Sequence, residues 1–300
     1  MSEIKNTYPL SKKKKSGVTT VLLGILSLAW IAPILVVILN SFKKKAYIFK
    51  SPFGISSKPL SAGFDMWQKG ISRAMAGMLN YKNALKKTDM LQCFGWSLFI
   101  TVGSVVLIIL CTSMCAWYIT RVKNKITHAI YIACLFSMIV PFQMVMFTLS
   151  KFSNILHLGN PFGIIIVYLG FGAGLAVFMF TGFVKSIPIE IEEAAYIDGC
   201  SPIQTYFRVV FPILKPTAIT VAILEAMWIW NDYLLPSLVL NVNKYRTIPI
   251  AIQYLKQSHG QIDWGAMMAA LVMAIVPIVA FYMACQKSII EGVTAGAIKG

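Results

Sequence analysis

The sequence predicts an all-α fold: a polytopic membrane protein with six transmembrane helices and a cytoplasmic elbow of two short helices. Of its 300 residues, 57% are hydrophobic and only 13% are charged, and the mean hydropathy is +0.71. A soluble domain of this length carries far more charge on its surface. A bilayer core of about 30 Å requires roughly 20 apolar residues in a helix. Six runs meet that requirement, namely Val18–Asn40, Phe94–Ile119, Ile126–Leu149, Phe162–Val184, Thr217–Leu240 and Gly265–Gln286.

The basic charge fits a membrane protein better than a nucleic-acid-binding one. The formal charge of +16 comes from 27 basic and 11 acidic residues. A nucleic-acid-binding protein gathers basic residues on a folded polar surface, whereas here they lie between long apolar runs, next to membrane lipid. We therefore expect no nucleic-acid partner. The six cysteines and three histidines form neither a disulfide framework nor a metal motif, so no metal site is expected.

Orientation follows from the Lys and Arg residues of the short loops. With the N-terminus inside, 13 of these residues lie in the cytoplasm and 4 on the opposite side. The first run is long for a signal peptide and no small-residue cleavage site follows it, so we interpret it as a retained helix. The prediction is a multi-pass protein of the cell membrane with cytoplasmic N- and C-termini. The external segment 41–92 disagrees, because it contains ten basic residues and Lys43-Lys44-Lys45 directly follows the first run.

The predicted organisation has four parts. Residues 1–17 form a cytoplasmic tail, 18–92 the first helix and an external segment, 93–289 a five-helix core with the loop 185–216, and 290–300 a second cytoplasmic tail. The external segment is too polar to span a membrane and too long for a simple turn. Its aromatic residues either pack a small external cap, which we favour, or anchor the segment at the membrane interface: Phe42, Phe49, Phe53, Phe64 and Trp67.

The loop 185–216 predicts two short helices joined at a glycine. Four of the eleven acidic residues lie within Glu190–Asp198, where they complement the positive end of a helix dipole. Pro188 suits the first turn of that helix. Gly199 supplies the left-handed conformation that closes a helix, and Ser201–Gln204 matches a capping box that starts another.

This elbow has two possible roles. Pro212 and Pro216 are expected to end the second helix before the fifth span. Ala194 and Ala195 offer a patch of short side chains that another protein surface can approach closely. The alternative is an amphipathic connector resting on the lipid surface, although dense acidic charge is repelled by anionic lipid.

At these residues the sequence resembles the EAA loop of ABC importer permeases. That pattern is E-A-A, two residues, D-G, nine residues, an aliphatic residue, two residues, then P. Here it is matched by Glu193-Ala194-Ala195, Asp198-Gly199, Val209 and Pro212. The resemblance extends to most of the chain and is closest to the maltose-type carbohydrate permeases of the binding-protein-dependent transport family. Supporting stretches are Trp230–Tyr233, Ser137–Gln143 and Gly292–Gly300.

The resemblance implies a transmembrane permease subunit of an ATP-driven, binding-protein-dependent importer for a sugar or oligosaccharide. Its implied partners are a second homologous permease, two cytoplasmic ATPase subunits and an external substrate-binding protein. The chain has no Walker A motif, so it is not expected to be an enzyme and has no catalytic residues of its own. ATP and Mg²⁺ would bind the partner ATPase, and no cofactor is expected in this chain.

Two groups of residues are implied to contact the ATPases. The elbow would be a coupling helix seated in an ATPase cleft, through Glu193, Ala194, Ala195, Asp198, Gly199 and Pro212. The C-terminal tail would lie as an extended chain between the two ATPase subunits, through Thr294, Ala295, Gly296, Lys299 and Gly300.

Three polar residues of the fifth run are candidates to line a pore. Glu225, Asn231 and Asp232 are costly in hydrocarbon, so we predict that they face the pore or a helix interface. Asn231 and Asp232 alternatively lie at the external headgroup level. A secondary, ion-coupled transporter is the main rival function. Such a transporter typically buries several ionisable groups in its spans, whereas here only the carboxylates of Glu225 and Asp232 lie within a span. An intramembrane enzyme needs a nucleophile motif such as GxSxG, which is absent.

Overall fold

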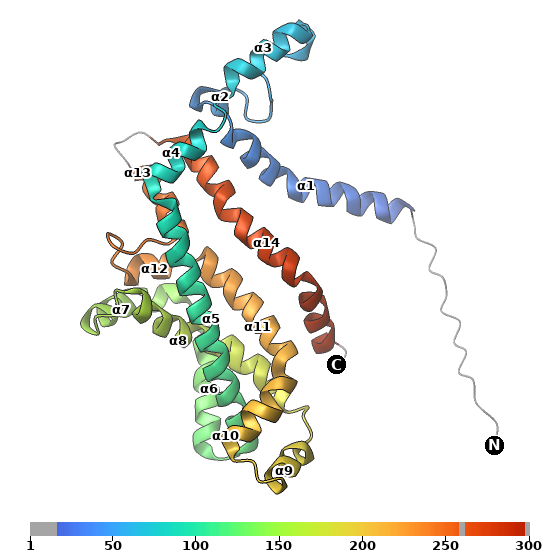
Figure 1. Ribbon diagram of the computed structural model, residues 1–300, viewed down its shortest axis with the longest axis vertical. Coiled ribbons are helices and arrows are strands. Elements are labelled where there is room, and N and C mark those ends of the chain that lie inside the picture. The colour runs from blue at the N-terminus through green and yellow to red at the C-terminus, as the bar shows by residue number, and fades with distance from the viewer. Residues whose placement is uncertain (1–16, 258–261, 298–300) are drawn as a thin grey trace, which may run out of the picture.

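The computed structural model describes residues 17–257 and 262–297. Within them the regular structure is helical, apart from one isolated antiparallel bridge between Lys43 and Met75. Figure 1 shows the arrangement. The elements in chain order are α1 (Gly17–Ser41), α2 (Lys45–Lys50), the 3₁₀ turn η1 (Leu60–Ala62), α3 (Phe64–Ala74), α4 (Leu79–Thr88), α5 (Met90–Arg121), α6 (Lys125–Ile139), α7 (Phe142–Ile155), α8 (Pro161–Val184), α9 (Ile189–Ile197), α10 (Pro202–Thr205), the π-helical segment η2 (Tyr206–Val210), α11 (Phe211–Asn231), α12 (Leu234–Val239), α13 (Ile248–Gln257) and α14 (Trp264–Ala297).

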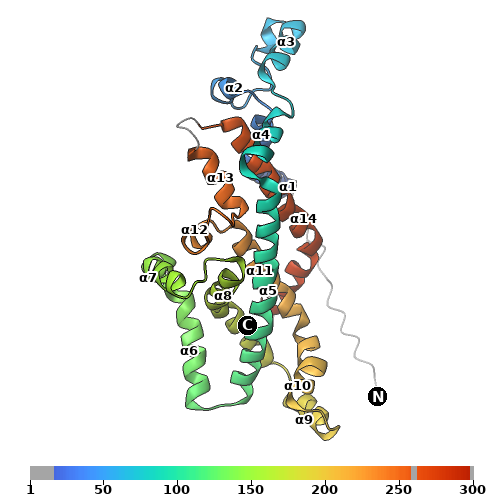
Figure 2. The same cartoon turned by 60° about the vertical axis from the view of Figure 1, so that its left-hand side comes forward.

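The third predicted span is a broken helix. Five helices of the described chain are long and apolar enough to cross a membrane, and α6 with α7 makes a sixth only if the bent pair is one span. The two helices meet at 107°, as Figure 2 shows for α6 and α7. The continuous helix expected over Ile126–Leu149 is therefore wrong. Pro141 is the cause, because proline has no N–H and holds the preceding residue out of the helical region; Val140 has φ −70° and ψ 119°.

The centre of the bundle is formed by α5, α8 and α11, which share one apolar cluster. Tyr168 of α8 and Ile108 of α5 are completely buried there. Glycines on α8 let the neighbouring helices approach closely. A Cβ atom added to Gly172 would lie 2.6 Å from Cδ1 of Ile108, and one added to Gly174 would lie 2.8 Å from the carbonyl oxygen of Cys134 in α6. Such small residues are typical of packing between membrane helices, where van der Waals contact replaces the hydrophobic effect.

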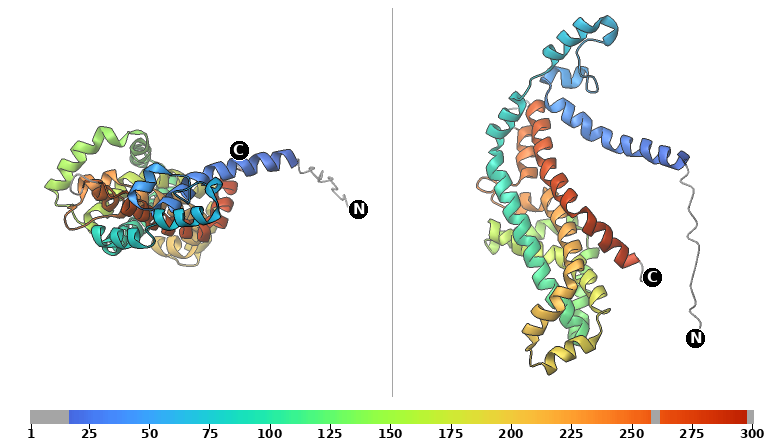
Figure 3. Two further views of the ribbon diagram at one scale, coloured as in Figure 1. Left: turned by 90° about the horizontal axis from the view of Figure 1, so that it is seen from above. Right: turned by 45° about the vertical axis from the view of Figure 1, so that its right-hand side comes forward.

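The first helix stands apart from this bundle. Figure 3 shows α1 leaning away from the other spans, and it packs against α14 only near its C-terminal end. None of its most apolar window is buried within the described chain, and Trp30 is 81% exposed. An apolar helix this exposed requires lipid or another protein around it.

The external segment is fixed to α1 by a buried lysine. Lys43 has no exposed surface, and its ammonium group donates hydrogen bonds to Oδ1 of Asn40 at 3.0 Å and to the carbonyl oxygens of Ser51 at 2.8 Å and Pro52 at 3.1 Å. Burial lowers the pKa of this lysine. The Asn80 side chain adds hydrogen bonds from α4 to the carbonyls at the end of α1, at 2.8 Å each. Polar contacts therefore hold α1, α4 and the loop after α2 together.

The aromatic residues of this segment do not form the core of a cap. Phe53 and Phe64 are 79% and 66% exposed. Phe64 stacks on Trp67 within α3, with ring centroids 6.0 Å apart, and Phe49 lies edge-on against Trp264 of α14 at 5.4 Å. The segment folds into short helices, and most of these aromatic surfaces face outward.

The ends of two predicted elements differ from expectation. The fifth run is not helical to Leu240, because α11 ends at Asn231 and α12 follows as a separate helix. The tail from Gly292 is not extended, because α14 continues as one helix to Ala297. No proline follows Pro277 in this alanine-containing stretch, so the helical hydrogen bonds continue. Residues 1–16 of the predicted N-terminal tail 1–17 lie outside the described residues.

Candidate functional site

The elbow between α8 and α11 is built as the local sequence predicts. Pro188 precedes α9 and Asp198 caps its end. Gly199 has φ +83°, the left-handed conformation that glycine adopts without strain. Ser201 and Gln204 form a reciprocal capping box: the Gln204 N–H donates to Oγ of Ser201 at 3.3 Å, and the Ser201 N–H donates to Oε1 of Gln204 at 2.9 Å. The first helix of the elbow therefore stops and the second starts within a few residues.

The second helix of the elbow does not end before the span. It runs from Pro202 to Asn231 as one helix of α10, η2 and α11, so the expected break at Pro212 and Pro216 is absent. The helix widens to π geometry over η2, immediately before Pro212. Proline in a helix removes one hydrogen bond and crowds the preceding turn, and a π segment relieves that crowding. The elbow is consequently continuous with the span.

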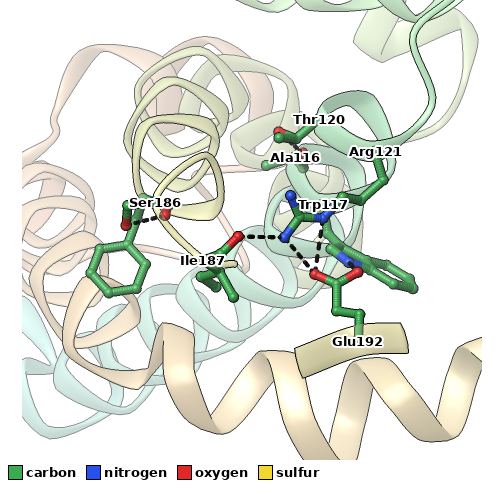
Figure 4. Close-up of polar contacts among 8 residues, drawn as sticks. Ala116, Trp117, Thr120, Arg121, Ser186, Ile187 and Glu192 are labelled. Carbon is green, nitrogen blue, oxygen red and sulfur yellow. Dashed lines mark hydrogen bonds and ion pairs between the residues drawn. The ribbon is translucent and has the colours of Figure 1, made fainter. Parts of the chain in front are cut away.

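An ion pair fastens α9 to the end of α5. The Glu192 carboxylate accepts hydrogen bonds from Nε and Nη2 of Arg121, at 2.9 and 2.6 Å, and from Nε1 of Trp117 at 2.9 Å. Arg121 also donates to the carbonyl oxygen of Ile187, in the linker between α8 and α9, at 3.0 Å. The Glu192 side chain is 4% exposed and that of Arg121 is 19% exposed. Figure 4 shows these side chains converging from α5, the linker and α9.

A second contact fastens the other half of the elbow to the same helix. Tyr206, in η2, is completely buried, and its hydroxyl group lies 2.6 Å from Oγ of Ser113 in α5. Its ring packs against Trp117, with centroids 5.5 Å apart. Both helices of the elbow therefore rest on the last turns of α5.

The six elbow residues predicted from the family resemblance are not all on the surface. Glu193, Ala194, Asp198, Gly199 and Pro212 are exposed, but Ala195 is 7% exposed and packs into the protein. The predicted patch of two alanines is therefore divided, because neighbouring helical residues point about 100° apart. The free surface of α9 combines Glu193, Ala194 and the 87%-exposed Ile197.

No sequence pattern predicted the contact between Arg121 and Glu192. Glu192 adjoins the motif, but its charge was explained by the helix dipole alone. Its partner is 71 positions away, and no spacing rule joins a basic residue at the end of one span to an acidic residue after another. The only available sign was a basic and an acidic residue on the same predicted side of the membrane.

The three polar residues of the fifth span occupy different surroundings. Glu225 is 2% exposed and lies in the interface with α5 and α8, so that a Cβ atom on Gly172 would lie 3.0 Å from its Oε2 atom. A helix interface is one of the two locations predicted for it. Asp232 follows the end of α11, where its carboxylate accepts hydrogen bonds from the Tyr168 hydroxyl at 3.1 Å and the Leu234 N–H at 2.9 Å. Asn231 is exposed beside it.

The predicted tail residues lie at the C-terminal end of α14 or beyond the described residues. Thr294, Ala295 and Gly296 belong to the last turns of α14, while Lys299 and Gly300 lie outside the described residues. In the part of the chain that the structure describes, no group of His, Cys, Asp and Glu side chains is arranged to hold a metal ion.

The fold and the elbow have counterparts among known proteins. Residues 108–294, more than half of the chain, match the family described as binding-protein-dependent transport system inner membrane component. A probable starch degradation products transport system permease protein, AmyC of Thermoanaerobacterium thermosulfurigenes, is 39% identical over 275 residues, covering 92% of this chain and 94% of the relative. A multiple sugar-binding transport system permease protein, MsmG of Streptococcus mutans, is 32% identical and covers 93% of this chain and 95% of the relative.

A solved structure shares the fold. A crystal structure of a bacterial ABC transporter involved in the import of the acidic polysaccharide alginate contains a chain that matches with a TM-score of 0.70. The match covers 90% of this chain and 94% of that one, at 23% sequence identity. The chain therefore shares its overall helical fold with that chain.

Proposed function

Because the chain belongs to the family of binding-protein-dependent transport system inner membrane components, we propose that it conducts a sugar or oligosaccharide through an ATP-driven importer. The observation that carries the substrate class is the similarity, over nearly the whole chain, to permeases named for starch degradation products and for multiple sugars. The ion-coupled alternative has no support from any relative. An ABC importer permease works with a substrate-binding protein and an ATPase, and the family match implies partners of these two kinds.

The proposed mechanism is alternating access driven through the elbow. ATP and Mg²⁺ bind to the partner ATPases, which close on ATP, hydrolyse it and push on the exposed face of α9. Glu193, Ala194, Asp198 and Gly199 form the docking surface, and Pro212 continues the lever into α11. The ties from Glu192 and Tyr206 to α5 support this mechanism, because they make the elbow and the span one rigid body. Movement of α5 and α11 then opens the pathway to one side of the membrane and closes it to the other.

The proposed assembly contains two permeases and two ATPases. The exposed apolar surface of α1 is the observation that supports a second homologous permease as a partner, since a large unpartnered apolar surface is typical of an interaction site. Asn231 and Asp232, which are exposed and half-buried respectively, are proposed to line the pathway, whereas Glu225 lies in the helix interface. The tail residues from Thr294 to Gly300 are proposed to contact the ATPases, with the part up to Ala297 entering as a helix.

The proposed orientation has both termini and the elbow in the cytoplasm. The short-loop count of 13 against 4 basic residues supports it. Reporter fusions at Ser57, in the external segment, and at Ser201, in the elbow, should give opposite sidedness. The same sidedness at both positions contradicts the orientation.

The function is tested by purification and transport. A tagged chain, expressed with its neighbouring transport genes, should co-purify with an ATPase subunit and a second permease. In proteoliposomes the complex should take up a labelled oligosaccharide only with ATP and a loaded binding protein. Uptake that needs an ion gradient and no ATPase would contradict the proposal, whereas ATP-driven uptake of amino acids instead of sugars would overturn the substrate class alone.

A further inference from the structure

A basic cavity lies where three membrane helices end on the elbow side of the molecule. It has a volume of about 640 Å³ and is formed by the end of α5, the start of α6 and the end of α8. Lys123, Lys125 and Lys185 line it, together with Asn124, Tyr131 and Thr181. None of the described residues that line it is acidic. The three positive charges therefore converge on one space without a compensating carboxylate.

The described chain contains two ion pairs, Lys87 with Asp263 and Arg121 with Glu192. None of the three lysines of the cavity takes part in either. All three are exposed, and the Lys185 ammonium lies 5.9 Å from the centre of the Tyr131 ring. Exposed lysines alone are common on any membrane protein's inner surface. A second observation is needed to distinguish a site from such a surface.

That observation is an unsatisfied hydroxyl group in the wall of the cavity. Thr181 is 3% exposed, and its Oγ1 atom is buried with no hydrogen-bond partner among the described residues. A helical threonine usually donates to the carbonyl four residues earlier. Thr112 and Thr120 of α5 do so, at 2.6 and 2.7 Å. A buried polar group without a partner costs about 1–3 kcal/mol, so a ligand that accepts a hydrogen bond from Thr181 would remove that cost.

We propose that this cavity binds the phosphate group of an anionic phospholipid. A phosphate oxygen accepts hydrogen bonds from a hydroxyl group and from ammonium groups, which are the donors present. The lipid source follows from position, because the cavity opens where the spans α5, α6 and α8 end, at the level of the headgroups. Basic pockets between membrane helices recognise anionic headgroups in this way. This proposed lipid site requires only that the chain is inserted in a membrane. It does not depend on which substrate the protein transports or in which direction.

The test uses the complex purified through a tag on this chain, stripped of lipid and titrated with the phosphatidylglycerol POPG or the phosphatidylcholine POPC in native mass spectrometry. The wild type should retain POPG in preference to POPC. The triple variant Lys123→Gln, Lys125→Gln, Lys185→Gln should lose roughly tenfold or more of its POPG affinity. The triple variant Lys58→Gln, Lys69→Gln, Lys82→Gln is the control, since it removes the same charge from exposed lysines of the external segment.

A single substitution distinguishes a specific phosphate-binding site from nonspecific attraction by positive charge. Thr181→Val keeps the shape of the side chain and removes only the hydroxyl group, so it should weaken POPG retention several-fold while the fold and the lysines remain. Equal retention of POPG and POPC by the wild type overturns the proposal, as does an equal loss in both triple variants. If excess inorganic phosphate displaces POPG completely, the occupant is a free anion and the lipid assignment is wrong.

Discussion

Replacing Glu192 by alanine should detach the elbow from α5 without unfolding the protein. The substitution removes the acceptor for three hydrogen bonds, two from Arg121 and one from Trp117. It leaves a partly buried guanidinium group with one remaining partner, the Ile187 carbonyl. Breaking a fully buried ion pair from one side costs about 3–5 kcal/mol. Because Arg121 is 19% exposed and keeps a partner, we expect a cost of about 2–3 kcal/mol here.

The assay is hydrogen–deuterium exchange of residues 187–199 in the purified complex without nucleotide. A cost of about 2–3 kcal/mol raises the population of the open elbow about 30- to 150-fold, since each 1.4 kcal/mol is a factor of ten. Exchange in that segment should rise accordingly, while the core of α8 stays protected. Glu192→Gln keeps an acceptor oxygen, so it should cost only about 1 kcal/mol.

The neighbouring glutamate provides the matched control. Glu193 lies one position further along α9 and is exposed, so Glu193→Ala should leave exchange unchanged. It should nevertheless reduce ATPase stimulation by the loaded binding protein, because it belongs to the proposed docking surface. Wild-type exchange rates in Glu192→Ala would refute the idea that the ion pair fastens the elbow.

Three further predictions concern the elbow, the external segment and the tail. Gly199→Asp forces a non-glycine residue to φ +83°, at a cost of about 1–2 kcal/mol. The variant should abolish uptake, while its insertion into the membrane, measured by fractionation, is retained. Lys43→Met leaves the Ser51 carbonyl without its donor and the Pro52 carbonyl with only the Asn40 amide. The complex should therefore melt at a lower temperature in a thermal scan, by an amount that Lys69→Met on the exposed surface does not reproduce. Truncation after Glu291 should leave assembly intact but reduce substrate-stimulated ATP hydrolysis, and unchanged stimulation would assign the tail no role in coupling.

Features set by neighbouring residues were predictable, and features set by distant contacts were not. Gly199 and the Ser201–Gln204 capping box are local, because a short stretch of chain contains all the groups involved. The spans were predictable for the same reason, because each is a run of consecutive apolar residues. The ion pair of Glu192 joins α9 to the end of α5, and only the packing of α5 against α8 brings its partners together.

Proline illustrates why local rules also fail. Pro141 breaks a helix that was expected to continue through it, whereas Pro212 and Pro216 lie within a helix that was expected to end at them. Pro212 follows the π-helical segment η2, which takes up the steric conflict. Tyr206, at the start of η2, is held against α5 by Ser113. Tertiary contact therefore keeps the helix continuous where its sequence favours a stop.

Lys43 explains why a charge next to a span need not report the orientation of that span. The positive-inside rule treats each lysine as a solvated charge that resists translocation. Lys43 is instead enclosed, with its ammonium group on two carbonyl oxygens and the Asn40 side chain. Such a lysine contributes to folding of the external segment and cannot remain at the lipid surface. Of the Lys43–Lys45 triplet, only Lys44 and Lys45 are exposed, so one of the ten basic residues that disagree with the short-loop count is explained by folding, and the orientation stays a prediction.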